Sequence, residues 1–320
     1  MSQSSIFRAL LRAVRPVGVL VGVLMYILGS GIARYLGTNI NWPVFWIGMA
    51  IITVLQLSAD FLREYFDLAG VRPPFESRRE PVRQKPKPAA TPDNLQEENE
   101  PAPPPVPAPR VAYLQVAATL LTIGAALTVL LYAQRSLPAA AGLFLGLAFV
   151  LVITYAVPPF RLAYSGYGEL ILAILNANLF SALAYLLQVG DLHRLLALLT
   201  FPLTFLYLAQ ELARSLHRYM DDIRLGRQTM LVRLGWQRGM SLHNALVGGA
   251  YLLVAISVMS GLSPRLAMPA ILSVPLGAFQ IWQISAIANG AKPRWRLLTI
   301  TAVATLGLTI YFINLALWTG

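Results

Sequence analysis

The chain has 320 residues, of which 57% are hydrophobic and only 12% charged, and its mean hydropathy is +0.61. Soluble domains carry about a quarter charged residues, so this composition excludes an ordinary soluble protein. The hydrophobic excess falls in long uninterrupted runs, which indicates a membrane protein with no nucleic-acid partner despite the net charge of +11. The absence of cysteine excludes disulfide scaffolds, thiolate metal sites and cysteine nucleophiles.

Nine apolar runs are long enough, at about 20 residues, to cross a hydrocarbon core about 30 Å thick as helices. Backbone polar groups in lipid must be paired internally, and no alternating barrel pattern competes with helices here. The first run follows three arginines but is too long for a signal peptide, so we interpret it as an anchor. The sequence therefore predicts an all-α membrane protein with nine transmembrane helices, at 17–36, 43–60, 111–132, 138–157, 169–189, 195–212, 243–261, 266–288 and 297–318.

The positive charges predict how these helices are oriented. With the N-terminus in the cytoplasm, the cytoplasmic segments hold 21 of the 25 lysines and arginines. Cytoplasmic loops carry such an excess of positive residues, which also attract anionic lipid headgroups. We expect a multi-pass protein of the plasma membrane, with its N-terminus inside and its C-terminus outside.

Two cytoplasmic loops, 61–110 and 212–242, are long and carry most of the charge. In the first, residues 73–109 hold twelve of the chain's 22 prolines. Such a segment cannot bury enough apolar area to offset its ordering entropy. We therefore expect one domain over residues 1–320, with 73–109 as a disordered, proline-rich cytoplasmic linker.

Each long loop also contains a charged cluster that follows a span. Asp60, Glu64 and Asp67 share one face of a helix that continues from the second span, with Arg63 beside them. The second cluster is expected on one broad helical face at the end of the sixth span, and its members are Glu211, Arg214, Arg218, Asp221 and Asp222.

Ionised side chains in mid-membrane cost about 2.5 to 3.5 kcal/mol each, so both clusters are expected to line a polar cavity. One interpretation is a network of salt bridges that pins the helix ends. The other is a site for a polyanion and a divalent metal, because carboxylates on facing helices hold Mg²⁺ beside phosphates. The residues alone leave both open.

Two further motifs carry a family resemblance. The first is Tyr155-Ala-Val-Pro-Pro-Phe-Arg-Leu-Ala-Tyr-Ser-Gly-Tyr-Gly-Glu169, and the second is Asp221-Asp222-Ile-Arg-Leu-Gly-Arg-Gln-Thr-Met-Leu-Val-Arg-Leu-Gly235. Together with Arg63-Glu64-Tyr-Phe-Asp67, they resemble the UbiA superfamily of intramembrane prenyltransferases, especially its 1,4-dihydroxy-2-naphthoate branch. The resemblance implies a nine-helix bundle around a central cavity, and a Mg²⁺-assisted transfer of a polyprenyl group from its diphosphate to an aromatic, quinone-precursor-like acceptor.

The resemblance also implies roles for particular residues. Asp67, Asp222 and Arg161 are the expected catalytic residues. The implied Mg²⁺ ligands are Glu64, Asp67, Asp221 and Asp222. The expected substrate-binding residues are Arg63, Tyr155, Arg218, Arg224, Arg227 and Asn176. Asn176 also has a simpler interpretation, because an amide inside a span usually hydrogen-bonds a neighbouring helix.

The chain departs from the family pattern at three positions. Arg63 replaces the usual Asn, while Val71 and Arg218 stand where the two motifs usually have Asp. Guanidinium binds phosphate bidentately without a metal, so the arginines can replace one Mg²⁺. Alternatively, the chain is a non-catalytic relative that binds a prenyl lipid. A transporter with charged gates is a third hypothesis, which the odd number of spans and the Arg-Leu-Gly tail argue against.

Prenyl transfer would place positive charge on the prenyl carbon and negative charge on the diphosphate. Arginine and Mg²⁺ would stabilise the negative charge. Aromatic faces would stabilise the positive charge by cation–π attraction, and the candidates are Tyr155, Tyr164, Tyr167 and Tyr207. These tyrosines can equally serve packing. The polyprenyl tail needs an apolar groove that is open to membrane lipid.

Overall fold

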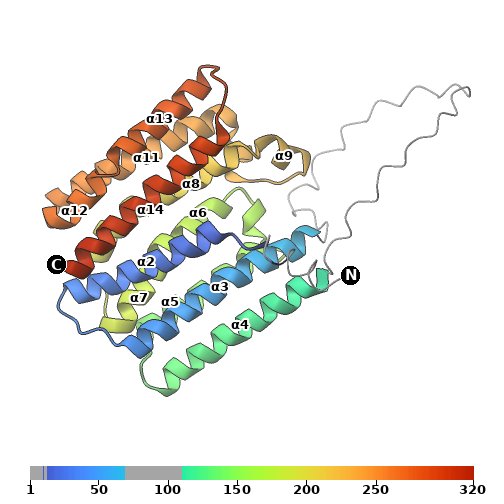
Figure 1. The fold of residues 1–320 in the computed structure, drawn as a ribbon. Helices are drawn as coiled ribbons and strands as arrows, with labels where there is room; N and C mark the ends of the chain where they lie inside the picture. The colour runs from blue at the N-terminus through green and yellow to red at the C-terminus, as the bar shows by residue number, and fades with distance from the viewer. Residues whose placement is uncertain (1–9, 11–12, 69–109) are drawn as a thin grey trace, which may run out of the picture.

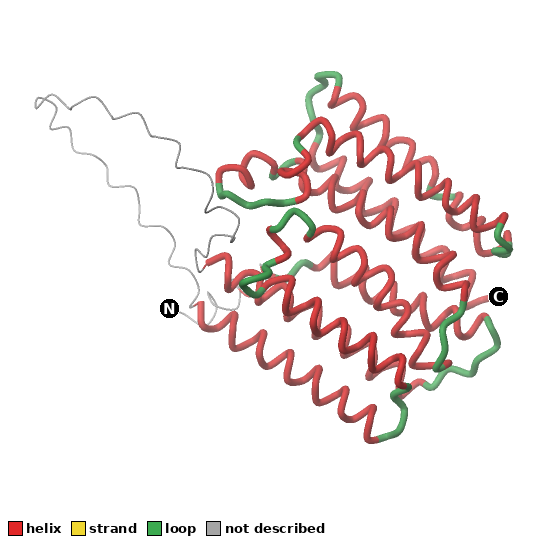
Figure 2. Tube along the Cα trace, turned by 180° about the vertical axis from the view of Figure 1, so that it is seen from behind, coloured by secondary structure: helices red, strands yellow, loops and turns green. Residues whose placement is uncertain are grey.

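Long apolar helices run side by side through the molecule, and short connections join them at the two ends (Figure 1). The computed structural model describes residues 10, 13–68 and 110–320. Over these residues, nine helices are long and apolar enough to cross a membrane. Figure 2 shows the same bundle from behind, with helices joined by loops. The predicted all-α fold is therefore confirmed, whereas the predicted linker at 73–109 and the motif position Val71 lie outside the described residues.

Most spans are single helices, and two are interrupted. The single ones are α2 (Pro16–Tyr35), α3 (Trp42–Leu68), α4 (Arg110–Ala133), α5 (Ala139–Ala156), α8 (Arg194–Leu216), α11 (Trp236–Met259) and α14 (Trp295–Thr319). The fifth span combines α6 (Gly168–Ala173), a π-helical turn (Ile174–Leu179) and α7 (Phe180–Val189), and the eighth combines α12 (Pro264–Ile271) and α13 (Val274–Ala288). The short elements are a 3₁₀ turn (Leu162–Tyr164), α9 (Tyr219–Arg224) and α10 (Met230–Leu234).

The two helices that carry the charged clusters end differently. Helix α3 has 27 residues, about 40 Å at 1.5 Å per residue, and reaches past Asp67 as predicted. Helix α8 ends at Leu216, and α9 begins only at Tyr219. The prediction of one continuous helical face from Glu211 to Asp222 is therefore wrong, because the chain turns at His217 and Arg218.

Buried apolar side chains form two clusters that divide the bundle. One cluster joins α2, α8, α11, α12 and α14, and the other joins α3, α4, α5 and α7. Helices α2 and α7 pack closely, and glycine makes this approach possible. A Cβ at Gly29 would collide with the Ser181 carbonyl oxygen. The close contact holds the two halves together beside the polar residues described below.

The outer surface is apolar, as a lipid-facing surface must be. Helix α4 buries little of its length in the bundle, and side chains such as Val129 and Leu130 face outward. Leu143, Leu147 and Val150 do the same on α5. Because α2 begins and α14 ends at opposite ends of the bundle, the chain ends on the other side from the start of its first span (Figure 1). Which end faces the cytoplasm stays a prediction.

Candidate active site

A polar cavity of about 340 Å³ lies at the end of the bundle where α3 and α8 terminate. It is lined from the start of α2, from α3, α5, α6, α8, α9 and α14, and from the loop after α9. Five arginines line it, against three carboxylates. The arginines are Arg15, Arg63, Arg214, Arg218 and Arg227, and the acids are Glu169, Glu211 and Asp222. Among the described residues, this imbalance gives the cavity a surplus of positive charge, which favours an anion.

Asp67, at the end of α3, is the centre of a buried ionic cluster beside the cavity. Its carboxylate accepts a hydrogen bond from Arg161 at 2.7 Å and another from the Tyr164 hydroxyl, and it lies 3.5 Å from an Arg227 nitrogen. Burial raises the pKa of Tyr164 to about 12, so the phenol keeps its proton and donates it. Asp67 therefore fixes Arg227 at the cavity and Arg161 directly behind it.

The backbone at Arg161 is itself unusual. Arg161 adopts φ 40° and ψ 52°, in the left-handed region that residues other than glycine rarely occupy. The conformation is retained because its guanidinium is fixed by Asp67 and lies over the Tyr164 ring, 5.0 Å from the centroid. Such local strain is common where a site needs a defined side-chain direction. The motif at 155–169 thus supplies Tyr155 to the cavity wall and Arg161 to the cluster behind it.

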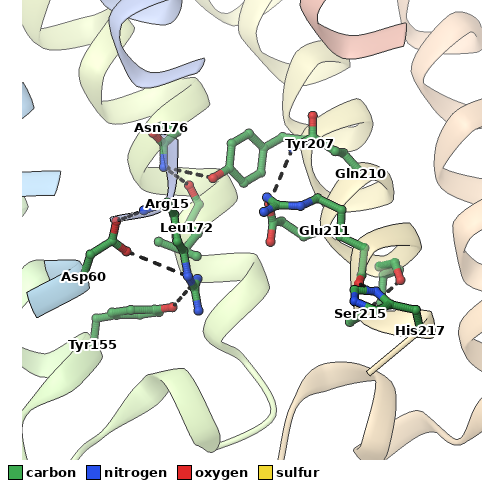
Figure 3. Close-up of polar contacts among 12 residues, drawn as sticks. Arg15, Asp60, Tyr155, Leu172, Asn176, Tyr207, Gln210, Glu211, Ser215 and His217 are labelled. Carbon is green, nitrogen blue, oxygen red and sulfur yellow. Dashed lines mark hydrogen bonds and ion pairs between the residues drawn. The ribbon is translucent and has the colours of Figure 1, made fainter. Parts of the chain in front are cut away.

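A second ionic pair joins the start of α2 to α3. The Arg15 backbone N–H donates to Asp60 at 2.9 Å, and the Arg15 Nε lies 3.8 Å from the same carboxylate. The Arg15 guanidinium also donates to the Tyr155 hydroxyl at 3.4 Å, and Figure 3 shows it between these two side chains. Burial alone would lower the pKa of Arg15, but Tyr155 and Asp60 raise it above its usual value.

The turn after α8 brings the start of the second motif, at Asp221 and Asp222, to the cavity end of the bundle. Arg214 donates to Glu211 at 2.8 Å, and the Arg218 Nε donates to His217 at 3.3 Å. The turn buries Asp222 against the cavity, 3.7 Å from an Arg227 nitrogen, while Asp221 stays exposed. Burial raises the pKa of Asp222, although Arg227 and Arg218 oppose the shift. Of the two aspartates, only Asp222 reaches the cavity.

Deeper in the bundle, polar side chains of the π-helical turn join the fifth and sixth spans. Asn176 donates to the Tyr207 hydroxyl at 3.2 Å and to the Leu172 carbonyl at 2.9 Å (Figure 3). Asn178 donates to Thr204 at 2.8 Å. These bonds match the helix-joining role. π-Helical turns often mark functional sites, however, and the buried Asn176 Oδ1 has no hydrogen-bond partner among the described residues. Its role as a substrate contact stays a prediction.

The structure brings together part of the predicted residue set. Arg63, Tyr155, Arg218, Asp222 and Arg227 line the cavity. Asp67 and Arg161 lie directly behind its Tyr164 wall, whereas Glu64, Asp221 and Arg224 do not line it.

Two residues of the cavity, Arg15 and Glu169, have no site role in the sequence analysis. Glu211 and Arg214 line the cavity as expected for the second charged cluster, whereas Asp60 does not line it and binds Arg15 instead. Glu169 was visible as the last residue of the first motif. Its carboxylate accepts from the Met230 backbone N–H at 3.1 Å, and this bond ties the loop after α9 to α6.

The donor set does not fit a cluster of metal ligands. Among the residues that the structure describes, no three His, Cys, Asp or Glu side chains converge as a metal site requires. Asp67 is engaged by Arg161, Arg227 and Tyr164, and Asp222 faces Arg227. The predicted ligands Glu64 and Asp221 do not line the cavity. The magnesium assignment therefore stays a prediction that these contacts do not support.

The geometry can be compared with that of known proteins. The structure is similar to the solved structure of a UbiA homologue from Archaeoglobus fulgidus bound to GPP and Mg²⁺, with a TM-score of 0.64. The superposition covers 98% of this chain and 100% of that one, at 15% sequence identity. The chain has the UbiA fold. The fold that the three short motifs implied by resemblance is thus confirmed over nearly the whole length of the chain.

Two curated relatives match part of this UbiA-fold chain. A 2-carboxy-1,4-naphthoquinone phytyltransferase of Synechocystis is 34% identical over 134 residues, which are 41% of this chain and 43% of that protein. A 1,4-dihydroxy-2-naphthoate octaprenyltransferase of Bacillus subtilis is 26% identical over 121 residues, 38% of this chain and 39% of that protein. The chain thus matches about two fifths of the length of these relatives. No protein-family model matches it.

Proposed function

We propose that the chain is a membrane-bound prenyltransferase. It moves a polyprenyl group from its diphosphate to an aromatic acceptor of the quinone-precursor kind. The observation that carries the proposal is the arginine-lined cavity of about 340 Å³ at one end of a UbiA fold. The partial matches to a naphthoquinone phytyltransferase and a naphthoate octaprenyltransferase support this class of acceptor.

The reaction breaks the allylic C–O bond of the prenyl diphosphate and forms a C–C bond to the acceptor ring. Guanidinium groups fixed in a cavity stabilise the negative charge that develops on the diphosphate oxygens. Asp67 holds Arg161 and Arg227 in place before the substrate arrives, so little reorganisation is needed. The ring carbon loses its proton after attack, and the departing diphosphate takes it up.

The aromatic faces of tyrosines are suited to stabilise the positive charge that develops on the prenyl carbon. Tyr155 and Tyr164 line the cavity, and the Tyr164 ring already has Arg161 and Arg227 within 5.0 and 5.6 Å of its centroid. A ring that attracts two guanidiniums also attracts an allylic cation. Tyr207 lies deeper, beside Asn176. We assign the cation-facing role to Tyr155, because it lines the cavity and Arg15 binds its hydroxyl rather than its ring.

The involvement of Mg²⁺ follows from the family resemblance and from the ion in the solved homologue. In this chain Asp67 and Asp222 are paired with arginines, so no step of the mechanism above passes through a metal.

Product analysis tests the proposed function directly. The purified protein is incubated in nanodiscs with polyprenyl diphosphates of several lengths and a panel of naphthoate and benzoate acceptors, and products are identified by mass spectrometry. We expect a prenylated acceptor together with released diphosphate. The Asp222→Ala variant is expected to be at least about 100-fold slower, because it removes the carboxylate that faces Arg227 at the cavity. Binding of the diphosphate without turnover of any acceptor would identify a non-catalytic relative instead.

We further propose that the cavity faces the cytoplasm and that the protein is a multi-pass protein of the plasma membrane. The chain has no cysteine, so single cysteines can report on topology without a background. Asn39 lies between α2 and α3, and Gln237 lies at the cavity end of α11; both are exposed. In intact cells, an impermeant maleimide is expected to label Asn39→Cys and to label Gln237→Cys only after permeabilisation. The reverse pattern would refute the orientation.

A further inference from the structure

We infer that the cavity binds the prenyl diphosphate directly through Arg63 and Arg218, with no divalent metal ion between the protein and the phosphates. The inference rests on the proposed function, since it names how the same site holds its substrate. Four observations carry it. They concern the acids that a metal would need, the two arginines, and the relation of these arginines to each other.

The acids that a metal would need already have cationic partners. Asp67 accepts from Arg161 at 2.7 Å and from Tyr164, and lies 3.5 Å from Arg227. Asp222 lies 3.7 Å from the same arginine. A divalent ion would have to displace these guanidiniums from buried carboxylates.

Arg63, at the cavity wall, has hydrogen-bonding capacity that its described neighbours do not use. Among the residues that the structure describes, its buried Nε–H has no hydrogen-bond partner, and its one ion pair, with Glu64, is as long as 4.0 Å. A buried donor that stays unpaired is unfavourable, and native structures pair the great majority of them. Because Arg63 lines the cavity, its guanidinium can donate to a phosphate oxygen that enters there.

Arg218 lies in a surplus of positive charge. In the part of the chain that the structure describes, no carboxylate lies within 4 Å of its guanidinium, which donates only to His217. The pKa of Arg218 is lowered, first by burial and then by the nearby charges of Arg15, Arg214 and Arg63. Positive groups thus repel one another around this point, and a bound polyanion would relieve the repulsion.

The two arginines reach the cavity from different parts of the bundle. Arg63 belongs to α3, and Arg218 lies in the turn between α8 and α9. Each guanidinium is a planar fork that binds phosphate bidentately, so two of them can hold a diphosphate from both sides. Both stand where the family motifs usually have an Asn or Asp residue. The same two substitutions that weaken the motif as a metal site therefore strengthen it as a direct phosphate site.

Binding of geranyl diphosphate, measured by calorimetry on the full chain in nanodiscs, tests the inference. In wild type, the affinity in EDTA is expected to lie within about threefold of the affinity in excess Mg²⁺. Arg63→Gln and Arg218→Gln are each expected to weaken binding by about tenfold or more in either buffer. The control Arg238→Gln removes an exposed arginine at the start of α11 and is expected to leave the affinity unchanged.

Binding that is lost in EDTA and restored by Mg²⁺ would overturn the inference, and so would wild-type affinity in both cavity variants. The chelator comparison uses only the wild-type chain, so it is decisive even where a variant fails to fold. The result is also independent of turnover. Metal-independent binding without any prenylated product would support the inference and refute the proposed function. Prenyl transfer that occurs with Mg²⁺, and that stops in chelator because binding is lost, would support the proposed function and refute the inference.

Discussion

Asp67→Ala is expected to lower kcat for prenyl transfer by at least about 100-fold and the stability of the fold by about 3 kcal/mol. The carboxylate is buried and binds Arg161, Arg227 and Tyr164 at once. Without it, Arg161 loses this carboxylate, and Arg227 is held at the cavity by the longer contact with Asp222. Initial rates and the midpoint of thermal unfolding in detergent measure the two effects.

The Asp67→Asn variant separates the positioning role of Asp67 from the effect of its negative charge. Asp67→Asn keeps an acceptor for Tyr164 and Arg161 but removes the negative charge, so its rate and stability are expected between those of wild type and Asp67→Ala. The matched control is Asp191→Asn, which changes an exposed aspartate just beyond α7 at the other end of the bundle. A loss of activity with no loss of stability, reversed by excess Mg²⁺, would instead make Asp67 a metal ligand.

The membrane spans were predictable because each is a continuous apolar run of about 20 residues, a pattern that few other structures share. The extension of α3 to Asp67 was predictable too, since acids three and four residues apart need a helix to share a face. The break after α8 was not. The sequence Leu216-His217-Arg218 contains neither Pro nor Gly, so no residue at this point signals the turn.

The partners of the site residues could not be derived from spacing. Asp67 and Arg161 are 94 positions apart, and Arg15 and Asp60 are 45 apart. Motif resemblance found Asp67, Arg161 and Asp222 as separate candidates, but not that the first two bind each other. Only the packing of α3 beside the turn after α5 shows that the Asp67 carboxylate is paired with Arg161. This contact changes the expected role of Asp67 from metal ligand to positioning group.

The buried pair of Arg15 and Asp60 supports a second prediction of large effect. Arg15→Gln is expected to lower stability by about 3 kcal/mol, because it leaves the buried Asp60 carboxylate without its cation. Breaking a buried ion pair from one side costs far more than removing both charges. The double variant Arg15→Gln with Asp60→Asn is therefore expected to recover most of the stability, and Asp60→Asn keeps an acceptor for the Arg15 backbone N–H.

Activity is expected to respond differently from stability. Arg15 lines the cavity and donates to Tyr155, so the double variant still lacks one of the five arginines that face the substrate. Its KM for the prenyl diphosphate is expected to rise by about tenfold while its unfolding midpoint returns toward the wild-type value. If stability and KM recover together, Arg15 serves only to anchor α2 to α3. If KM stays high in a stable protein, the start of α2 is part of the diphosphate site.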